Sequence, residues 1–286
     1  MGKRASLRRI QLPFILMYLM PTTLDQLVAE ARLRVEHSMR TVDYDALKRR
    51  ADKHVPRGFR ANLVKVSASA PAVIAELKKA SPSKGVIRDP LHVARIASEL
   101  EQAGAAALSV LTEEEHFNGS LANLVEASAA TSLPCLRKDF IVHEFQIVEA
   151  KAHGADAILL IVAALSQNEL MSLLRAAKER GMDVLVEAHD VEEVQRAVDA
   201  GAEVIGVNSR DLRTFQVNIE TAMELGKTIP SSIVRVAESG IHSAEDMSRL
   251  RGAGFSAFLV GESLMRADSP GAMLRELLQP STVRGD

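Results

Sequence analysis

The chain has 286 residues, 47% of them hydrophobic, so it is long enough to bury one large core. Its formal net charge of -2 excludes the large basic surplus that follows a nucleic-acid backbone. The single cysteine, Cys135, excludes an internal disulfide, and we predict a buried thiol in a reducing compartment. We therefore expect a cytoplasmic protein with a small-molecule partner, no nucleic acid and no membrane.

The first residues combine a basic stretch with an apolar one. Four basic residues within positions 3–9 precede the apolar run 10–20, which is the order of a secretory signal. The run is too short to span a membrane and lacks a small-residue cleavage site, so a signal or anchor is the less favoured interpretation. We predict a poorly ordered arm over 1–19, or an extension upstream of a natural start near Met20, and then one domain over 20–286.

Past the arm, helix-like and strand-like segments alternate. Helical periodicity over 24–53 follows a capped start and belongs to an N-terminal extension, 21–65. Eight apolar runs typical of strands follow: 72–77, 106–111, 133–138, 156–162, 183–187, 203–208, 233–238 and 256–261. Helix-like stretches between them include 90–102, 144–152, 167–180, 191–200 and 244–251. This alternation predicts an α/β fold, a (β/α)8 barrel with an N-terminal helical extension. An open doubly wound sheet is disfavoured because no glycine-rich dinucleotide motif follows the first strand.

Several predicted strands end in a polar or charged residue. All strands of such a barrel end at one rim, where side chains from different strands converge. The rim set is Glu76, Lys78, Lys138, Glu187, Asn208 and Ser239. Taken singly, each is more often a solvated strand end. Because buried carboxylates and amines shift the pKa of one another, the set as a whole predicts acid–base catalysis.

Two turns of glycine and serine follow the last two predicted strands. Ser239 and Gly240 come after the seventh, and a Gly-Glu-Ser turn that begins at Gly261 comes after the eighth. In barrel enzymes these loops commonly bind phosphate through backbone N–H groups. Ser81, after the first strand, is expected to add a hydroxyl or an amide. The sequence therefore predicts a phosphorylated substrate.

Seven ordered segments resemble the indole-3-glycerol phosphate synthase family. They are IAELKKASPSKG (74–85), LSVLTEEEHFNGS (108–120), LRKDFIVHEFQI (136–147), GADAILLIVAAL (154–165), VNSRDL (207–212), VAESGI (236–241) and LVGESLM (259–265). The resemblance runs from about Pro21 to Leu278. It implies conversion of 1-(2-carboxyphenylamino)-1-deoxyribulose 5-phosphate to indole-3-glycerol phosphate in tryptophan biosynthesis. Carbon dioxide and water are lost, and no cofactor or metal is implied.

The resemblance also implies catalytic roles. Lys138 falls on the family's general acid, which protonates the substrate ketone. Lys78 falls on the lysine that meets the substrate carboxylate, and Glu76 orients the amines. Glu187 matches a second acid–base residue that acts during dehydration, and Asn208 matches an amide that hydrogen-bonds the sugar hydroxyls. Which lysine donates the proton for dehydration stays open.

The binding residues follow from the same match. The phosphate cradle is expected to comprise Ser81, Ser239, Gly240, Gly261 and the backbone of Glu262, whose carboxylate must then point away. Arg210 and Leu212 match the rim above the substrate. Phe117 and Phe140 follow the second and third strands, where they would flank the anthranilate ring or else pack in the core.

Two other function classes compete with this interpretation. A phosphoribosyl isomerase or a Schiff-base aldolase would reuse the phosphate loops, yet would not require Glu76, Lys78, Lys138 and Glu187 together. A non-catalytic barrel in a regulatory or assembly role predicts the loss of at least one acid–base position. For the oligomeric state we expect a monomer or a weak homo-oligomer.

Overall fold

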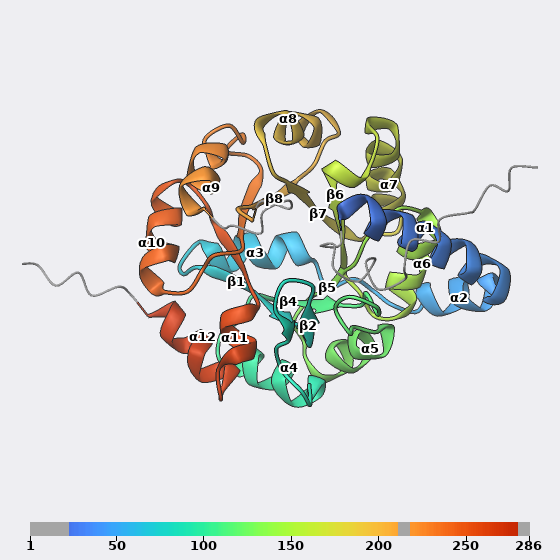
Figure 1. The fold of residues 1–286 in the computed structure, drawn as a ribbon, viewed down its shortest axis with the longest axis horizontal. Coiled ribbons are helices and arrows are strands. Elements are labelled where there is room, and N and C mark those ends of the chain that lie inside the picture. The colour runs from blue at the N-terminus through green and yellow to red at the C-terminus, as the bar shows by residue number, and fades with distance from the viewer. Residues whose placement is uncertain (1–22, 211–217, 280–286) are drawn as a thin grey trace, which may run out of the picture.

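The computed structural model describes residues 23–210 and 218–279. Eight parallel strands form a closed barrel (Figure 1). They are β1 (Ala72–Leu77), β4 (Ala107–Leu111), β5 (Cys135–Lys138), β6 (Ala157–Ile161), β7 (Asp183–Ala188), β8 (Val204–Asn208), β9 (Val234–Glu238) and β10 (Ala257–Val260). Strand β1 pairs with both β4 and β10, which closes the barrel. The predicted fold class is therefore confirmed, and an open sheet is excluded.

Helices surround the barrel and bury one face against it. They are α4 (Val93–Gln102), α5 (Leu121–Ala130), α6 (Glu144–Ala152), α7 (Gln167–Glu179), α8 (Val191–Asp199), α9 (Ile219–Gly226), α10 (Ala244–Gly252), α11 (Glu262–Arg266) and α12 (Pro270–Leu278), with the 3-10 turn η2 (Val162–Ala164) after β6. In α4 the buried residues are Val93, Ile96, Ala97 and Leu100, the spacing of a single helical face. All six residues of β1 are buried, as expected of a strand covered on both faces.

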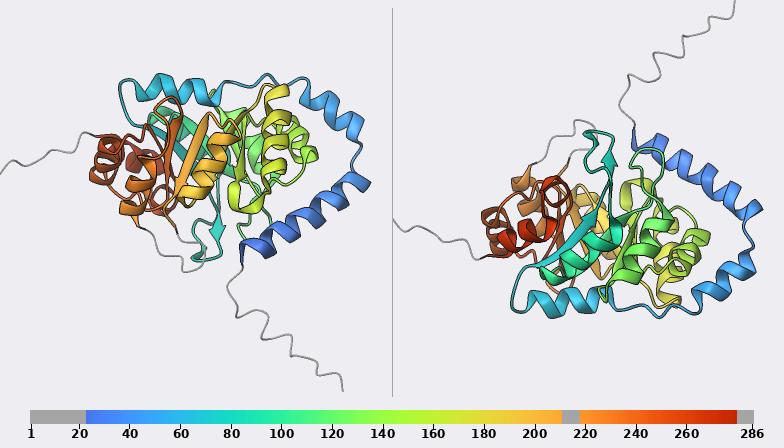
Figure 2. Two further views of the ribbon diagram at one scale, coloured as in Figure 1. Left: turned by 90° about the horizontal axis from the view of Figure 1, so that it is seen from above. Right: turned by 90° about the horizontal axis from the view of Figure 1, so that it is seen from below.

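The N-terminal extension forms three helices, α1 (Leu24–Thr41), α2 (Tyr44–Ala51) and α3 (Phe59–Ser67). Thr23 and Gln26 make the capping box that starts α1, as predicted. The helical segment predicted over 24–53 is divided into two helices, because the Asp43 side chain accepts the Ala46 N–H and starts a new helix there. Helix α3 covers one end of the barrel, whereas α1 reaches the opposite end (Figure 2).

A short hairpin follows β1 at the same end of the barrel as α1 (Figure 2). Its strands, β2 (Ala80–Ser81) and β3 (Gly85–Val86), pair antiparallel. Gly85 has a φ of 63°, a value that glycine adopts without steric cost. The hairpin was not expected from the sequence, since two residues per strand carry no periodic signal.

A buried ion pair joins the extension to the barrel. Asp156, just before β6, is fully buried, and its Oδ2 atom accepts hydrogen bonds from Arg57 Nη2 (2.6 Å), Arg57 Nε (2.9 Å) and Cys135 N (2.6 Å). His54 Nε2 lies 3.1 Å from the other carboxylate oxygen. Burial alone would raise the pKa of Asp156, but its hydrogen bonds with His54 and Arg57 lower it below the ordinary value.

In the part of the chain that the structure describes, no helix is both long and apolar enough to cross a membrane. The apolar run 10–20 and the predicted arm 1–19 lie outside that part.

Candidate active site

The carboxyl ends of the strands open into one cavity. Every predicted site residue within the described ranges lines it: Glu76, Lys78, Ser81, Phe117, Lys138, Phe140, Glu187, Asn208, Arg210, Ser239, Gly240, Gly261 and Glu262. Leu212, the remaining predicted residue, lies outside the described residues. Helix α1 contributes Leu24 and Leu27 to the wall, which the sequence did not predict.

Two pairs, each of an amine and a carboxylate, lie at the carboxyl ends of the barrel strands. After β1, Lys78 Nζ lies 2.6 Å from Oε1 of Glu76, which is 4% exposed. Residues two apart on a strand share a face, which is why this pair forms. Gly261, after β10, leaves room for the pair, because a Cβ there would collide with Glu76 Oε1.

Lys138 and Glu187 form the second pair, from β5 and β7. Lys138 Nζ lies 3.3 Å from Glu187 Oε2. Burial would lower the pKa of Lys138, but the negative charges of Glu187 and Glu76 help to raise it above the ordinary value. Burial would raise the pKa of Glu187, but Lys138 and His189 hold it well below its usual range. At neutral pH the pair is therefore an ammonium beside a carboxylate.

Glu238, at the end of β9, is a functional candidate that the sequence reasoning missed. It lines the cavity and is 2% exposed. Burial and the neighbouring charge of Glu187 raise its pKa well above the ordinary value. The pKa values of these two carboxyl groups are thus shifted in opposite directions, a hallmark of acid–base sites. The parity used for Lys138 and Glu187 also applies to Glu238, two residues after the buried Val236, and would have found it.

The Glu238 carboxyl group occupies space that is free only because residue 206 is a glycine. Gly206 belongs to β8, and a Cβ at this position would collide with Glu238 Oε1. It would also come within 3.2 Å of Leu185 Cδ1. Any side chain at 206 would therefore push the Glu238 carboxyl group out of its place.

Asn208 links the acid–base pair to the rim. Its Nδ2 donates to Glu187 Oε1 at 3.0 Å. Its Oδ1 accepts from Ser239 Oγ at 2.9 Å and from the Arg210 backbone N–H at 3.1 Å. These contacts fix the amide, so that its donor faces the Glu187 carboxylate.

Four of the five residues predicted to bind phosphate directly follow β9 and β10, and the fifth, Ser81, lies in β2; all five line the cavity. Ser239 and Gly240 are consecutive left-handed residues, with φ values of 64° and 72°. For serine this conformation is uncommon, and such a residue often marks a site under functional constraint. Glu262 Oε1 accepts from Arg266 Nε at 3.0 Å, which engages the carboxylate one helical turn away along α11.

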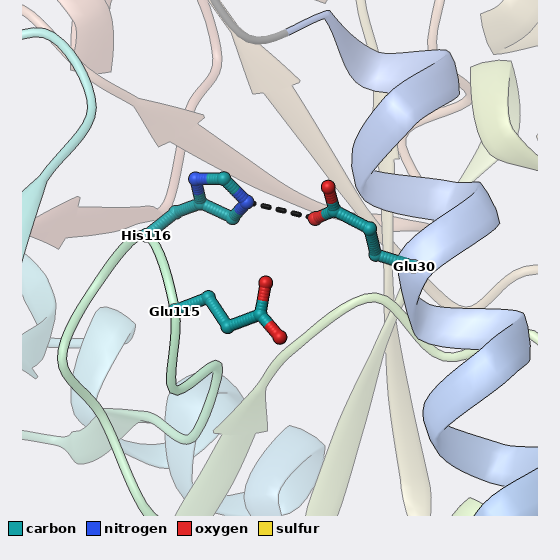
Figure 3. A group of neighbouring side chains, drawn as sticks. All are labelled: Glu30, Glu115 and His116. Carbon is teal, nitrogen blue, oxygen red and sulfur yellow. Dashed lines mark hydrogen bonds and ion pairs between the residues drawn. The ribbon is translucent and has the colours of Figure 1, made fainter. Parts of the chain in front are cut away.

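A group of titratable side chains outside the cavity anchors α1. Glu30, Glu115 and His116 have ligand atoms within 4.8 Å of one another (Figure 3). His116 Nε2 lies 2.8 Å from Glu30 Oε2, and Arg34 Nη1 lies 3.3 Å from Glu113 Oε1. These ion pairs join α1 to the loop after β4 and account for the grouping.

Fold and site together define a barrel enzyme with paired amines and carboxyl groups at the carboxyl ends of its strands. The family model described as "Indole-3-glycerol phosphate synthase" matches residues 24–277. The chain therefore belongs to the indole-3-glycerol phosphate synthase family. Over 259 residues it is 54% identical to the indole-3-glycerol phosphate synthase of Koribacter versatilis, covering 91% of this chain and 100% of that protein. A relative with the same name from Burkholderia vietnamiensis is 47% identical over 259 residues, covering 90% and 99%.

These matches confirm the function and the enzyme class predicted from the sequence, a carboxy-lyase of tryptophan biosynthesis. Among solved structures, thiamine phosphate pyrophosphorylase from Pyrococcus furiosus superposes with a TM-score of 0.54 at 16% identity, covering 74% of this chain and 95% of that one. A mandelate oxidase gives 0.53 at 20% identity, covering 66% and 65%. At such identities the likeness shows the barrel fold alone.

Proposed function

We propose that this chain closes the indole ring of 1-(2-carboxyphenylamino)-1-deoxyribulose 5-phosphate, with Lys138 as the general acid. One observation carries the proposal: the Lys138 ammonium lies 3.3 Å from Glu187 in a cavity that also holds the Lys78–Glu76 pair. An acid, a base and a carboxylate-binding cation thus share one enclosed site.

In the first step, the ring carbon that bears the carboxylate attacks the ketone carbon. A carbon–carbon bond forms, and the carbonyl π electrons move to the oxygen. The ammonium of Lys138 stabilises this developing charge and transfers a proton to it. The raised pKa of Lys138 keeps the proton in place until the oxygen becomes basic.

In the second step, the bond between the ring and the carboxylate breaks. Its electrons restore the aromatic ring, and carbon dioxide leaves. Lys78 binds the carboxylate on arrival, and Glu76, 2.6 Å from Lys78 Nζ, moderates that attraction by competing for the same cation. A weaker ionic hold favours release of the neutral product.

In the third step, the new hydroxyl group leaves as water. An ammonium, either Lys78 or Lys138, protonates it, and Glu187 takes a proton from the carbon next to nitrogen. The lowered pKa of Glu187 keeps it ionised and ready to act as the base. Single-turnover kinetics of Lys78 and Lys138 variants would identify the acid.

The phosphate group of the substrate is proposed to bind to the loops that follow β1, β9 and β10. The residues concerned are Ser81, Ser239, Gly240, Gly261 and the backbone of Glu262, all of which line the cavity. Arg210 lines the same cavity, and with Leu212 it would cover the substrate. Phe117 and Phe140 line it too, and they are proposed to flank the anthranilate ring.

The proposal is tested by the appearance of an indole ultraviolet spectrum when purified protein meets the substrate. Lys138→Met is expected to fold and to lose at least about a hundredfold in turnover, the usual effect of removing an acid catalyst. Lys79→Met is the matched control, because Lys79 pairs with Asp89 at 3.2 Å and does not line the cavity. Near-normal turnover of Lys138→Met would remove Lys138 from this role.

We further propose a reaction without cofactor or metal, in a monomer or weak homo-oligomer of the cytoplasm. Burial raises the pKa of the Cys135 thiol to about 12, which keeps the thiol protonated and unreactive. Activity that survives dialysis against a chelator, together with light scattering at working concentration, tests the first two points.

A further inference from the structure

His189 lies beside Glu187 but outside the cavity. It comes just after β7, two residues beyond Glu187, and its side chain is 15% exposed. Its Nε2 atom lies 3.3 Å from Glu187 Oε1. Glu187 lines the cavity and His189 is absent from the lining, so within the described residues the imidazole contacts Glu187 from outside the cavity wall.

The imidazole ring is held from its other side by the start of α8. Nδ1 lies 3.1 Å from Glu193 Oε2, and the His189 backbone N–H donates to the same oxygen at 2.8 Å. The Glu193 backbone N–H in turn donates to Asp190 Oδ1, which caps α8. The ring is thus held by the Glu193 side chain, which lies in the first turn of α8.

The arrangement favours a positively charged ring. Burial would lower the pKa of His189, but the neighbouring carboxylates of Glu187 and Glu193 raise it to about 10. The buried Nε2 atom has no hydrogen bond of good geometry in the described part of the chain. Its contact with Glu187 is therefore mainly electrostatic.

The other groups around Glu187 come from four further strands. Lys138 from β5 and Asn208 from β8 contact the carboxylate directly. Glu238 from β9 lies close enough for the charge of Glu187 to raise its pKa, and Glu76 from β1, like Glu187, helps to raise the pKa of Lys138. When Lys138 gives its proton to the substrate, the positive charge beside the two carboxyl groups of Glu187 and Glu238 disappears. His189 donates no proton to the substrate, so its charge stays.

We propose that His189 is a positioning residue whose fixed positive charge keeps Glu187 ionised and oriented throughout the catalytic cycle. The inference rests on the role of Glu187 proposed above. It assigns to the imidazolium the task of keeping Glu187 ionised after Lys138 has become neutral, when the positive charge of Lys138 no longer favours the carboxylate.

The test uses His189→Gln in the full chain. An opposite charge within about 4–6 Å typically lowers a carboxyl pKa by roughly 1–3 units, so its loss should move the acidic limb of log kcat against pH upward by about one unit or more. Because the ring also orients the carboxylate, we expect kcat to fall about tenfold even at pH 7, where Glu187 stays ionised in the free enzyme. KM should stay within about twofold because His189 does not line the cavity. His153→Gln, which changes a histidine at the end of α6, is the matched control and should change neither quantity.

A double variant separates a positioning role from a general structural one. In a Glu187→Gln background, His189→Gln should change single-turnover rates by less than about twofold, because the carboxylate it acts on is gone. An equal loss in that background, or an unchanged pH profile of the single variant, would overturn the proposal. His189→Lys, which restores a cation, should recover part of the lost kcat.

A measurement on the unaltered chain covers the case in which His189→Gln fails to fold. Long-range proton–nitrogen NMR spectra should show both ring nitrogens of His189 protonated at pH 8, and a neutral ring at pH 7 would overturn the proposal. Absence of indole formation by the unaltered chain would instead refute the proposed function, and the NMR result would be unaffected.

Discussion

Replacing Asp156 with alanine removes the carboxylate that joins the N-terminal extension to the barrel. Asp156 is fully buried and receives five hydrogen bonds or ion contacts, from His54, Arg57 and the Cys135 backbone. The Arg57 side chain, 22% exposed, would keep its charge without its partner. The residue lies before β6, at the end of the barrel away from the cavity, so the chemistry should be spared.

The expected loss of stability comes from leaving Arg57 without the carboxylate of its buried pair. Removing one partner of such a pair typically costs about 3–5 kcal/mol. A domain of this size shifts in Tm by roughly 2–4 °C per kcal/mol, so we expect a fall on the order of 10 °C. Glu224→Ala is the control: its pair with Lys227 has the same 2.6 Å distance but is exposed, and little change in Tm is expected.

Thermal unfolding followed by circular dichroism at several pH values tests the idea. Because the folded-state pKa of Asp156 is lowered, its stabilisation is complete above the unfolded-state pKa of about 3.9 and is lost as pH falls through the lower folded-state value. The Tm difference between the unaltered chain and the variant should therefore narrow below about pH 4. A variant that melts within about 1 °C of the unaltered chain at pH 7 would refute the reasoning.

Three further outcomes are expected. Gly240→Asp should raise the apparent KM with little change in kcat, and inorganic phosphate should compete with substrate; unchanged KM would place the phosphate elsewhere. Gly206→Ala should displace the Glu238 carboxyl group and lower kcat by about tenfold or more with Tm largely kept, a result that normal turnover would contradict. A chain starting at Met20 should keep its activity and thermal midpoint, since 1–19 contains no predicted site residue; aggregation or loss of most activity would show that the arm belongs to the fold.

Strand parity explains why much of the site is predictable from sequence. Side chains two positions apart share a face, and all barrel strands end at one rim, so Lys138 and Glu187 can be brought together without coordinates. The boundaries of β1 also match those predicted, because its apolar run is continuous. By contrast, β5 begins at Cys135, two residues later than predicted, after Pro134, which has no N–H to donate.

Protonation states are what the sequence does not reveal. The pKa of Glu238 is raised because the group is buried and because the charge of Glu187, from another strand, acts on it. His189 is charged because the start of α8 brings Glu193 against it. The break between α1 and α2 likewise depends on the local choice of one side chain, Asp43, to bind a backbone N–H. Periodicity reports which face a residue occupies, but these effects depend on distances between elements.

The buried ion pair between Arg57 and Asp156 also sets an order of events during synthesis. Its two halves are separated by 99 positions, and ribosomes add roughly 5–20 residues per second, so Arg57 waits on the order of 5–20 s for its partner. During that time α1 and α2 have no barrel to cover, because α6, against which α2 packs, is also unmade. Docking of the first-made helices therefore requires that the chain has been completed at least through Asp156, just before β6.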